Sequence, residues 1–311
     1  MTGAERWGLV AVLVLLGAGW GITQPLAKIA VTGGYSHFGL VFWQLALGAV
    51  LLGALNLARG KGLPFAPRHQ RLYVIIALIG TILPNSASYQ AVGHLPAGVL
   101  SILVSLVPMF AFPIALAIGI DRFSPLRFAG LVAGLAGVVL IVAPESSLPD
   151  PTMILWVPVA LIAPFFYAIE GNYVARKGTE GLDAIQTLLG ASVVGTVLAL
   201  PLAVGTGQWI DPRPPWGLRD LAVLGIGAIH AAVYATYVWL VGRAGSVFAA
   251  QTAYLVTLWG ILWAKLLLGE AYSSWVWAAL ALMLTGLFLV QPRPRGVLAP
   301  VVPLPDTAPR R

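Results

Sequence analysis

Long apolar runs dominate the chain, and short polar stretches separate them. The first run, LVAVLVLLG, covers residues 9–17 without a single charged side chain. A helix needs about 20 mainly apolar residues to cross the hydrocarbon core of a bilayer. Runs of about this length recur along the chain, and they predict ten membrane-spanning helices. The predicted spans are residues 7–30, 37–57, 71–92, 95–119, 126–143, 153–175, 183–205, 219–241, 246–268 and 273–291.

Composition agrees with this pattern. Hydrophobic residues make up 59% of the 311 residues and charged residues only 9%, whereas about a quarter of a soluble domain is charged. The apolar runs are continuous, so they favour helices over the alternating strands of a membrane β-barrel. We therefore expect an all-α integral membrane protein. We expect the Pro- and Arg-rich segment 292–311 to be a disordered cytoplasmic tail.

The distribution of basic residues predicts the orientation. With the N-terminus in the cytoplasm, 14 of the 18 Lys and Arg residues fall in cytoplasmic segments, and only Arg213 and Arg219 fall in exterior loops. Such a bias follows the positive-inside rule. The net charge of +7 is thereby explained by topology, with the lipid bilayer as the partner and no nucleic acid. Both termini are expected in the cytoplasm, with the chain in a bacterial inner membrane.

The chain repeats itself after 149 residues. Residues 93–143 then align with residues 242–292 without a gap, and Asp121 meets Glu270 in the corresponding short loop, where we expect both to cap the following helices near Ser124 and Ser273. We assign the first repeat to residues 1–148 and the second to residues 149–291. Five spans per repeat is an odd number, so the two repeats are inverted in the membrane. Inverted repeats are typical of alternating-access transporters with a central site.

Polar side chains recur on one helical face in both repeats. Thr81, Asn85 and Ser88 follow helical spacing, and the shift of 149 places them on His230, Tyr234 and Tyr237. Lipid cannot solvate such residues, so they predict a protein-lined cavity. Small glycine rows such as Gly130, Gly134 and Gly137 are expected to pack helices. The candidate substrate-binding residues are Trp20, Gln24, Asn85, Ser88, Tyr89, Ser101, Ser105, Tyr167, Glu170, His230, Tyr234, Tyr237 and Tyr254.

Several of these residues have an alternative structural interpretation. Trp20 and Gln24 either line the cavity or pack helices around a kink, while Lys28 is expected to reach exterior water along its own stem. Glu170 either couples to protons or pairs with a cation such as Arg176. His230 either contacts the substrate or hydrogen-bonds a neighbouring helix.

The segments WGITQPLAK, AGVLSILVSLVPMF and GEAYSSWVWAALALMLTGLFLVQP, in this layout of spans, resemble the EamA-type exporters of the drug/metabolite transporter superfamily. The similarity extends to about Pro292 and is greatest to YddG-type bacterial exporters of aromatic and other amino acids. Such exporters often carry an arginine in the second span, where FWQLALG has Gln44.

The expected function is export of small amphipathic metabolites, most simply amino acids including aromatic ones. A multidrug or organic-cation exporter of the same fold, or a channel, is the alternative. No enzyme is expected, because the catalytic motifs H-E-x-x-H and G-x-S-x-G are missing from the sequence. With 4 His and no Cys we expect no metal and no cofactor, and we expect a monomer or loose dimer.

Overall fold

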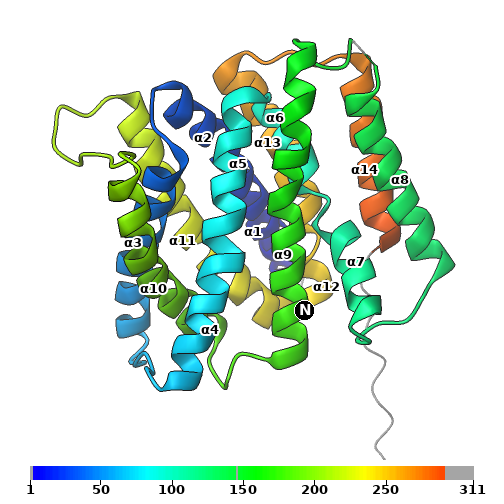
Figure 1. Ribbon diagram of the computed structural model, residues 1–311. Coiled ribbons are helices and arrows are strands. Elements are labelled where there is room, and N and C mark those ends of the chain that lie inside the picture. The colour runs from blue at the N-terminus through cyan, green and yellow to red at the C-terminus, as the bar shows by residue number, and fades with distance from the viewer. Residues whose placement is uncertain (1–2, 145, 291–311) are drawn as a thin grey trace, which may run out of the picture.

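The computed structural model describes residues 3–144 and 146–290, and the regular secondary structure of these residues is all helical, with no strand. The predicted tail, residues 292–311, lies outside the described residues. The elements are α1 (Gly3–Gly21), α2 (Thr23–Thr32), α3 (His37–Ala58), α4 (Pro67–Ala77), the π-helix η1 (Leu78–Ile82), α5 (Leu83–His94), α6 (Ala97–Val104), α7 (Val107–Ala117), α8 (Pro125–Val142), the 3-10 helix η2 (Pro151–Trp156), α9 (Val157–Lys177), α10 (Ala184–Gly205), α11 (Leu218–Ala244), α12 (Ser246–Ala249), α13 (Thr252–Leu268) and α14 (Ser274–Val290) (Figure 1).

These helices form the ten predicted spans. Eight helical stretches are long and apolar enough to cross a membrane, and the shorter apolar helices α13 and α14 complete the set. Each predicted span overlaps its helix to within a few residues, because a continuous apolar run leaves a chain in lipid no other way to satisfy its backbone. The protein is therefore an all-α membrane protein with two inverted five-helix repeats.

Several spans are interrupted near their middle. The first is divided between α1 and α2 beside Pro25, the third contains η1 just before Pro84, and the fourth is divided between α6 and α7 beside Pro108. Proline removes a backbone donor and clashes with the preceding turn. Backbone groups near these breaks accept side-chain hydrogen bonds, such as that from Trp263 Nε1 to the Ala18 carbonyl at 3.0 Å. The breaks thus leave backbone groups without a partner in their own helix, and side chains inside the protein can hydrogen-bond to them.

Glycine lets two peripheral helices approach closely. Helices α8 and α14 lie side by side at the right of Figure 1. A Cβ atom on Gly130 would lie 2.8 Å from the Gly286 carbonyl oxygen, so the two backbones touch as the glycine row predicts. On α8, Val132 and Leu135 are exposed and face the lipid.

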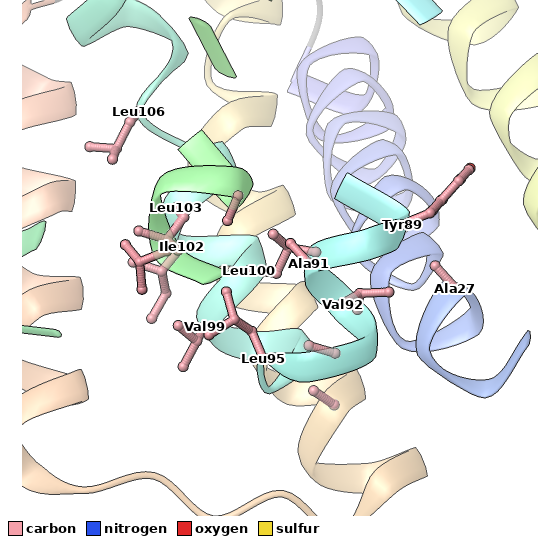
Figure 2. Close-up of a cluster of buried hydrophobic side chains, with 14 of the residues drawn as sticks. Ala27, Tyr89, Ala91, Val92, Leu95, Val99, Leu100, Ile102, Leu103 and Leu106 are labelled. Atoms are coloured by element: carbon pink, nitrogen blue, oxygen red, sulfur yellow. The ribbon is translucent and has the colours of Figure 1, made fainter. Parts of the chain in front are cut away.

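The largest apolar core surrounds the corner between α5 and α6. Figure 2 shows Leu95 at this corner, with Val92 close to Ala27 of α2. Leu95, Val92 and Ala27 are all fully buried. This corner of the helical bundle is therefore tightly packed.

Two expectations about helix ends, those for Glu270 and Asp121, are wrong. Lys28 is partly exposed, and its Nζ also donates to the carbonyls of Gly93 at 3.3 Å and Leu95 at 3.0 Å. Glu270 accepts from the backbone N–H groups of Ala97 at 2.7 Å and Gly98 at 3.1 Å, so it caps α6 of the other repeat.

Asp121 pairs with the side chain of Arg127, and Ser124 makes no side-chain cap for α8. Glu270 thus binds the backbone of a distant helix and Asp121 binds an arginine side chain, so neither carboxylate caps the helix that follows it. Ser273 does accept from the Val276 N–H at 3.4 Å in the first turn of α14.

Candidate functional site

Gln44 of α3 is the centre of a buried polar network. Its side-chain oxygen accepts from Asn85 Nδ2 at 3.0 Å and from the Tyr89 hydroxyl, and the Tyr167 hydroxyl donates to the Asn85 oxygen. Gln44 is 5% exposed and Asn85 is 7% exposed. We call these four residues the amide–phenol network. It connects α3, α5 and α9, and no hydrogen bond among the described residues uses the Gln44 side-chain nitrogen, which remains a donor.

A small cavity lies beside this network. Its volume is about 20 Å³, and it lies between α3, η1, α10 and α11. About 10–15 Å³ on this measure holds one water molecule, so the cavity is too small for an amino acid unless the helices separate. The lining residues are Gln44, Leu45, Gly48, Leu52, Thr81, Leu188, Ser192, Gly227, His230 and Ala231.

One cavity residue, His230, belongs to a group of aromatic rings. The ring centroids of Trp20 and His230 are 6.4 Å apart, and those of Trp20 and Tyr237 are 5.5 Å apart. We call these three residues the aromatic cluster. Helix α1 thereby meets α11, and His230 connects the cluster to the cavity that Gln44 and Thr81 also line. This combination suits a ligand that is partly aromatic and partly polar.

Glu170 of α9 supplies a carboxylate near the same region. A Cβ atom on Gly80 would lie 2.5 Å from Glu170 Oε1, so the carboxylate lies against the backbone of η1. Tyr167 and Tyr234 are close enough to interact with it electrostatically. Among the described residues it has neither a hydrogen bond nor an ion pair, so the alternative pairing with Arg176 is wrong. An ionisable side chain without a partner inside a membrane span is costly, and such residues usually serve a functional site.

The remaining predicted residues lie at varied places. Ser101 donates to the Ala97 carbonyl at 3.0 Å and Ser105 to the Ile102 carbonyl at 2.7 Å, so both hydroxyls bond their own helix. Ser88 is buried on α5. The side-chain oxygen of Gln24 is buried with no partner among the described residues, while Tyr254 packs on the large core cluster.

Of the four polar cavity residues only His230 is in the predicted set; Gln44, Thr81 and Ser192 are not, although Thr81 lies on the predicted polar stripe. Gln44 had a signal in the sequence, since it is an amide within the apolar run VFWQLALG. Ser192 had none, because a serine hydroxyl can in general be satisfied by a carbonyl of its own helix, so one serine in an apolar run does not indicate a site. Among the described residues no group of His, Cys, Asp and Glu is arranged to hold a metal ion.

Ten apolar helical spans in two inverted repeats enclose this polar and aromatic interior. That architecture defines a multi-pass membrane transporter.

The sequence pattern of the EamA-like transporter family matches residues 6–143 and again residues 154–291. The chain belongs to this family.

Two relatives span nearly the whole chain. The "Uncharacterized transporter YvbV" of Bacillus subtilis (strain 168) is 25% identical over 308 residues, which is 96% of each chain. The "Probable terminal-alkyne amino-acid exporter" of Streptantibioticus cattleyicolor is 25% identical over 300 residues, covering 93% of this chain and 94% of its own. One crystal structure has a TM-score of 0.61 at 19% identity and covers 93% of this chain and 96% of its own, which shows the fold alone.

Proposed function

We propose that the protein is a secondary transporter that exports small amphipathic amino compounds, chiefly amino acids including aromatic ones, by alternating access. The observation that carries the proposal is the Glu170 carboxylate, which has no cation partner among the described residues and lies near aromatic rings. A substrate ammonium group would neutralise this charge, because a carboxylate and an ammonium form a strong charge-assisted hydrogen bond.

The rest of the substrate would contact neutral groups. The free side-chain N–H groups of Gln44 and the ring of His230 offer donors for a substrate carboxylate. Trp20 and Tyr237 offer ring faces for an aromatic side chain. A relative carries the name of an amino-acid exporter, which supports the same substrate class without deciding it. In this proposal the other predicted residues, including Gln24, Ser88, Ser101, Ser105 and Tyr254, line the cavity once it opens.

The proposed setting is the inner membrane of a bacterium, with both termini in the cytoplasm. The excess of Lys and Arg in the segments on one side of the spans supports this orientation. We also propose that the repeats, residues 1–148 and 149–291, move against each other in a monomer or loose dimer.

The test is counterflow of radiolabelled tryptophan by purified protein in proteoliposomes. We expect saturable uptake by the wild type and a loss of at least about tenfold for Glu170→Gln, since a hydrogen bond to a charged group contributes about 1.5–3 kcal/mol. Glu180→Gln removes an exposed carboxylate just beyond α9 and should transport normally. Wild-type activity in Glu170→Gln would exclude this carboxylate from the site.

Two other functions have distinct outcomes in the same assay. An organic-cation exporter needs the Glu170 carboxylate but no donor for a substrate carboxylate, so tryptamine would replace tryptophan as the better substrate. A channel would give unitary currents and no counterflow.

A further inference from the structure

Lys28 connects two helices at one end of the protein. Its ammonium group bonds the carbonyls of Gly93 and Leu95 at the end of α5. The last carbonyls of a helix lack partners within the helix and carry its negative partial charge, so a lysine there is both a donor and a complementary charge. Helix α2 also packs against α5, and Figure 2 shows Leu95 and Val92, both buried, near this end of α5.

The internal repeat supplies a second lysine in the same position. The shift of 149 residues that aligns Gly93 with Gly242 also aligns Lys28 with Lys177. Lys177 is the last residue of α9, and Gly242 lies in the last turn of α11. In each half, a lysine at the end of the first span therefore corresponds to carbonyls at the end of the third span.

The second contact is not formed in this structure. Lys177 and Gly242 are both exposed, and Lys177 makes no hydrogen bond or ion pair with the described residues. Helix α2 packs firmly on α5, whereas α9 and α11 touch marginally at most. The two halves share a sequence pattern but differ in this contact, which is formed at the Lys28 end and not formed at the Lys177 end.

We infer that Lys28 and Lys177 are the alternating closing residues of the transport cycle. Lys28 holds the exterior end closed while the cavity opens to the cytoplasm, and Lys177 bonds the carbonyls of Gly242 and Ala244 when the exterior end opens. Inverted repeats exchange conformations between the two states of such a cycle, and each contact stabilises one state only. The inference rests on the proposed alternating access, but its test needs no substrate.

The chain has no cysteine, so spin labels on introduced cysteines can report both ends by pulsed electron resonance distances. One pair is Thr32 with Gln90 at the exterior end, and the other is Ala175 with Trp239 at the cytoplasmic end; all four residues are exposed. The wild type should show a short exterior and a long cytoplasmic distance. Lys28→Met keeps the apolar stem and should shift the ratio of closed to open exterior by about tenfold or more, as expected for one charged hydrogen bond. The cytoplasmic distance should shorten in the same molecules.

The double variant Lys28→Met/Lys177→Met isolates the second lysine. Because it lacks both closing contacts, its distances should return toward those of the wild type.

The two family matches begin 148 residues apart, and a shift of 148 residues would pair Lys28 with Arg176 instead. The matched control is therefore Lys28→Met/Arg176→Met, which should keep the distances of Lys28→Met. A Lys28→Met protein that only unfolds at lower temperature, with unchanged distances, would show a helix cap and overturn the inference. The assignment to Lys177 would be overturned if the distances returned toward the wild-type values in Lys28→Met/Arg176→Met. It would also be overturned if they did not return in Lys28→Met/Lys177→Met. Failure of tryptophan counterflow would leave these distances unaffected, so it would contradict the proposed substrate alone.

Discussion

At the scale of single residues, the sequence identified polar positions better than it identified their partners. Asn85 was predicted from helical spacing and Tyr89 was among the candidate aromatic residues, and the structure buries both. Their shared acceptor, Gln44, is 41 residues from Asn85 in the chain, and helical periodicity carries no information on which span lies opposite. The pairing of Glu170 with Arg176 was wrong for a related reason, since closeness in sequence does not fix where two side chains on one helix point.

The network around Gln44 should contribute strongly to stability. Gln44→Leu keeps most of the volume but leaves the Asn85 amide and the Tyr89 hydroxyl without their acceptor. Each unsatisfied buried group costs about 1–3 kcal/mol. We expect a clearly lower unfolding temperature in detergent, measured by tryptophan fluorescence. Gln90→Leu makes the same change at an exposed position of α5 and should leave it unchanged; equal unfolding temperatures for both variants would contradict a structural role for Gln44.

At the scale of helices, ends that follow local rules are predictable and ends fixed by distant partners are not. The segment DAIQ at the start of α10 is readable as a capping box, and Asp183 and Gln186 do cap each other's backbone N–H groups. The same carboxylate also accepts from Arg59 at 2.8 Å and Lys61 at 2.7 Å. Those partners belong to another loop, so only the fold brings them together.

The Asp183 cluster should make stability depend on pH. Partial burial by itself would raise the pKa of Asp183, but the hydrogen bonds from Arg59, Lys61 and the Gln186 backbone outweigh it and hold the pKa well below its usual range. A lowered folded-state pKa adds stability above the unfolded value of about 3.9, and this stability is lost as the pH falls through the folded pKa. Asp183→Asn keeps a capping residue, so the variant should be less stable than the wild type at pH 7.

The difference in unfolding temperature between the wild type and Asp183→Asn should narrow steadily below about pH 4. It should also narrow in 1 M salt, because the cluster is partly exposed and salt screens its charges. Lys61→Met removes one of the two cations that pair with Asp183, so it should reduce the loss of unfolding temperature caused by Asp183→Asn. A difference that stays constant from pH 7 to pH 3 would mean that the side chain acts through packing and not through its charge.

At the scale of the whole molecule, the number and limits of the spans followed from hydropathy, because lipid forces every backbone group into a helix. The interior arrangement did not follow, because nothing in an apolar run states which of its faces meets which neighbour. The substrate is the least predictable property. It depends on a few side chains around a cavity of about 20 Å³, and these come from four separate elements.

The orientation is directly testable. Single cysteines at Arg68 and Asp150, both exposed, should differ in their reaction with a membrane-impermeant maleimide. Asp150→Cys should react in intact cells, whereas Arg68→Cys should react only after lysis, as the positive-inside rule requires. The reverse pattern would invert the proposed topology.

The tightly packed corner between α2, α5 and α6 also has an electrical consequence. An opening filled with water sustains little voltage, so the membrane potential falls mainly across the sealed part of the protein. Moving one net positive charge outward against an inside-negative potential of 100 mV costs about 2.3 kcal/mol. A zwitterionic amino acid avoids this cost. A cationic amine avoids it only if a proton returns in exchange, and Glu170 is the carboxylate in the interior that could hold that proton on the way back.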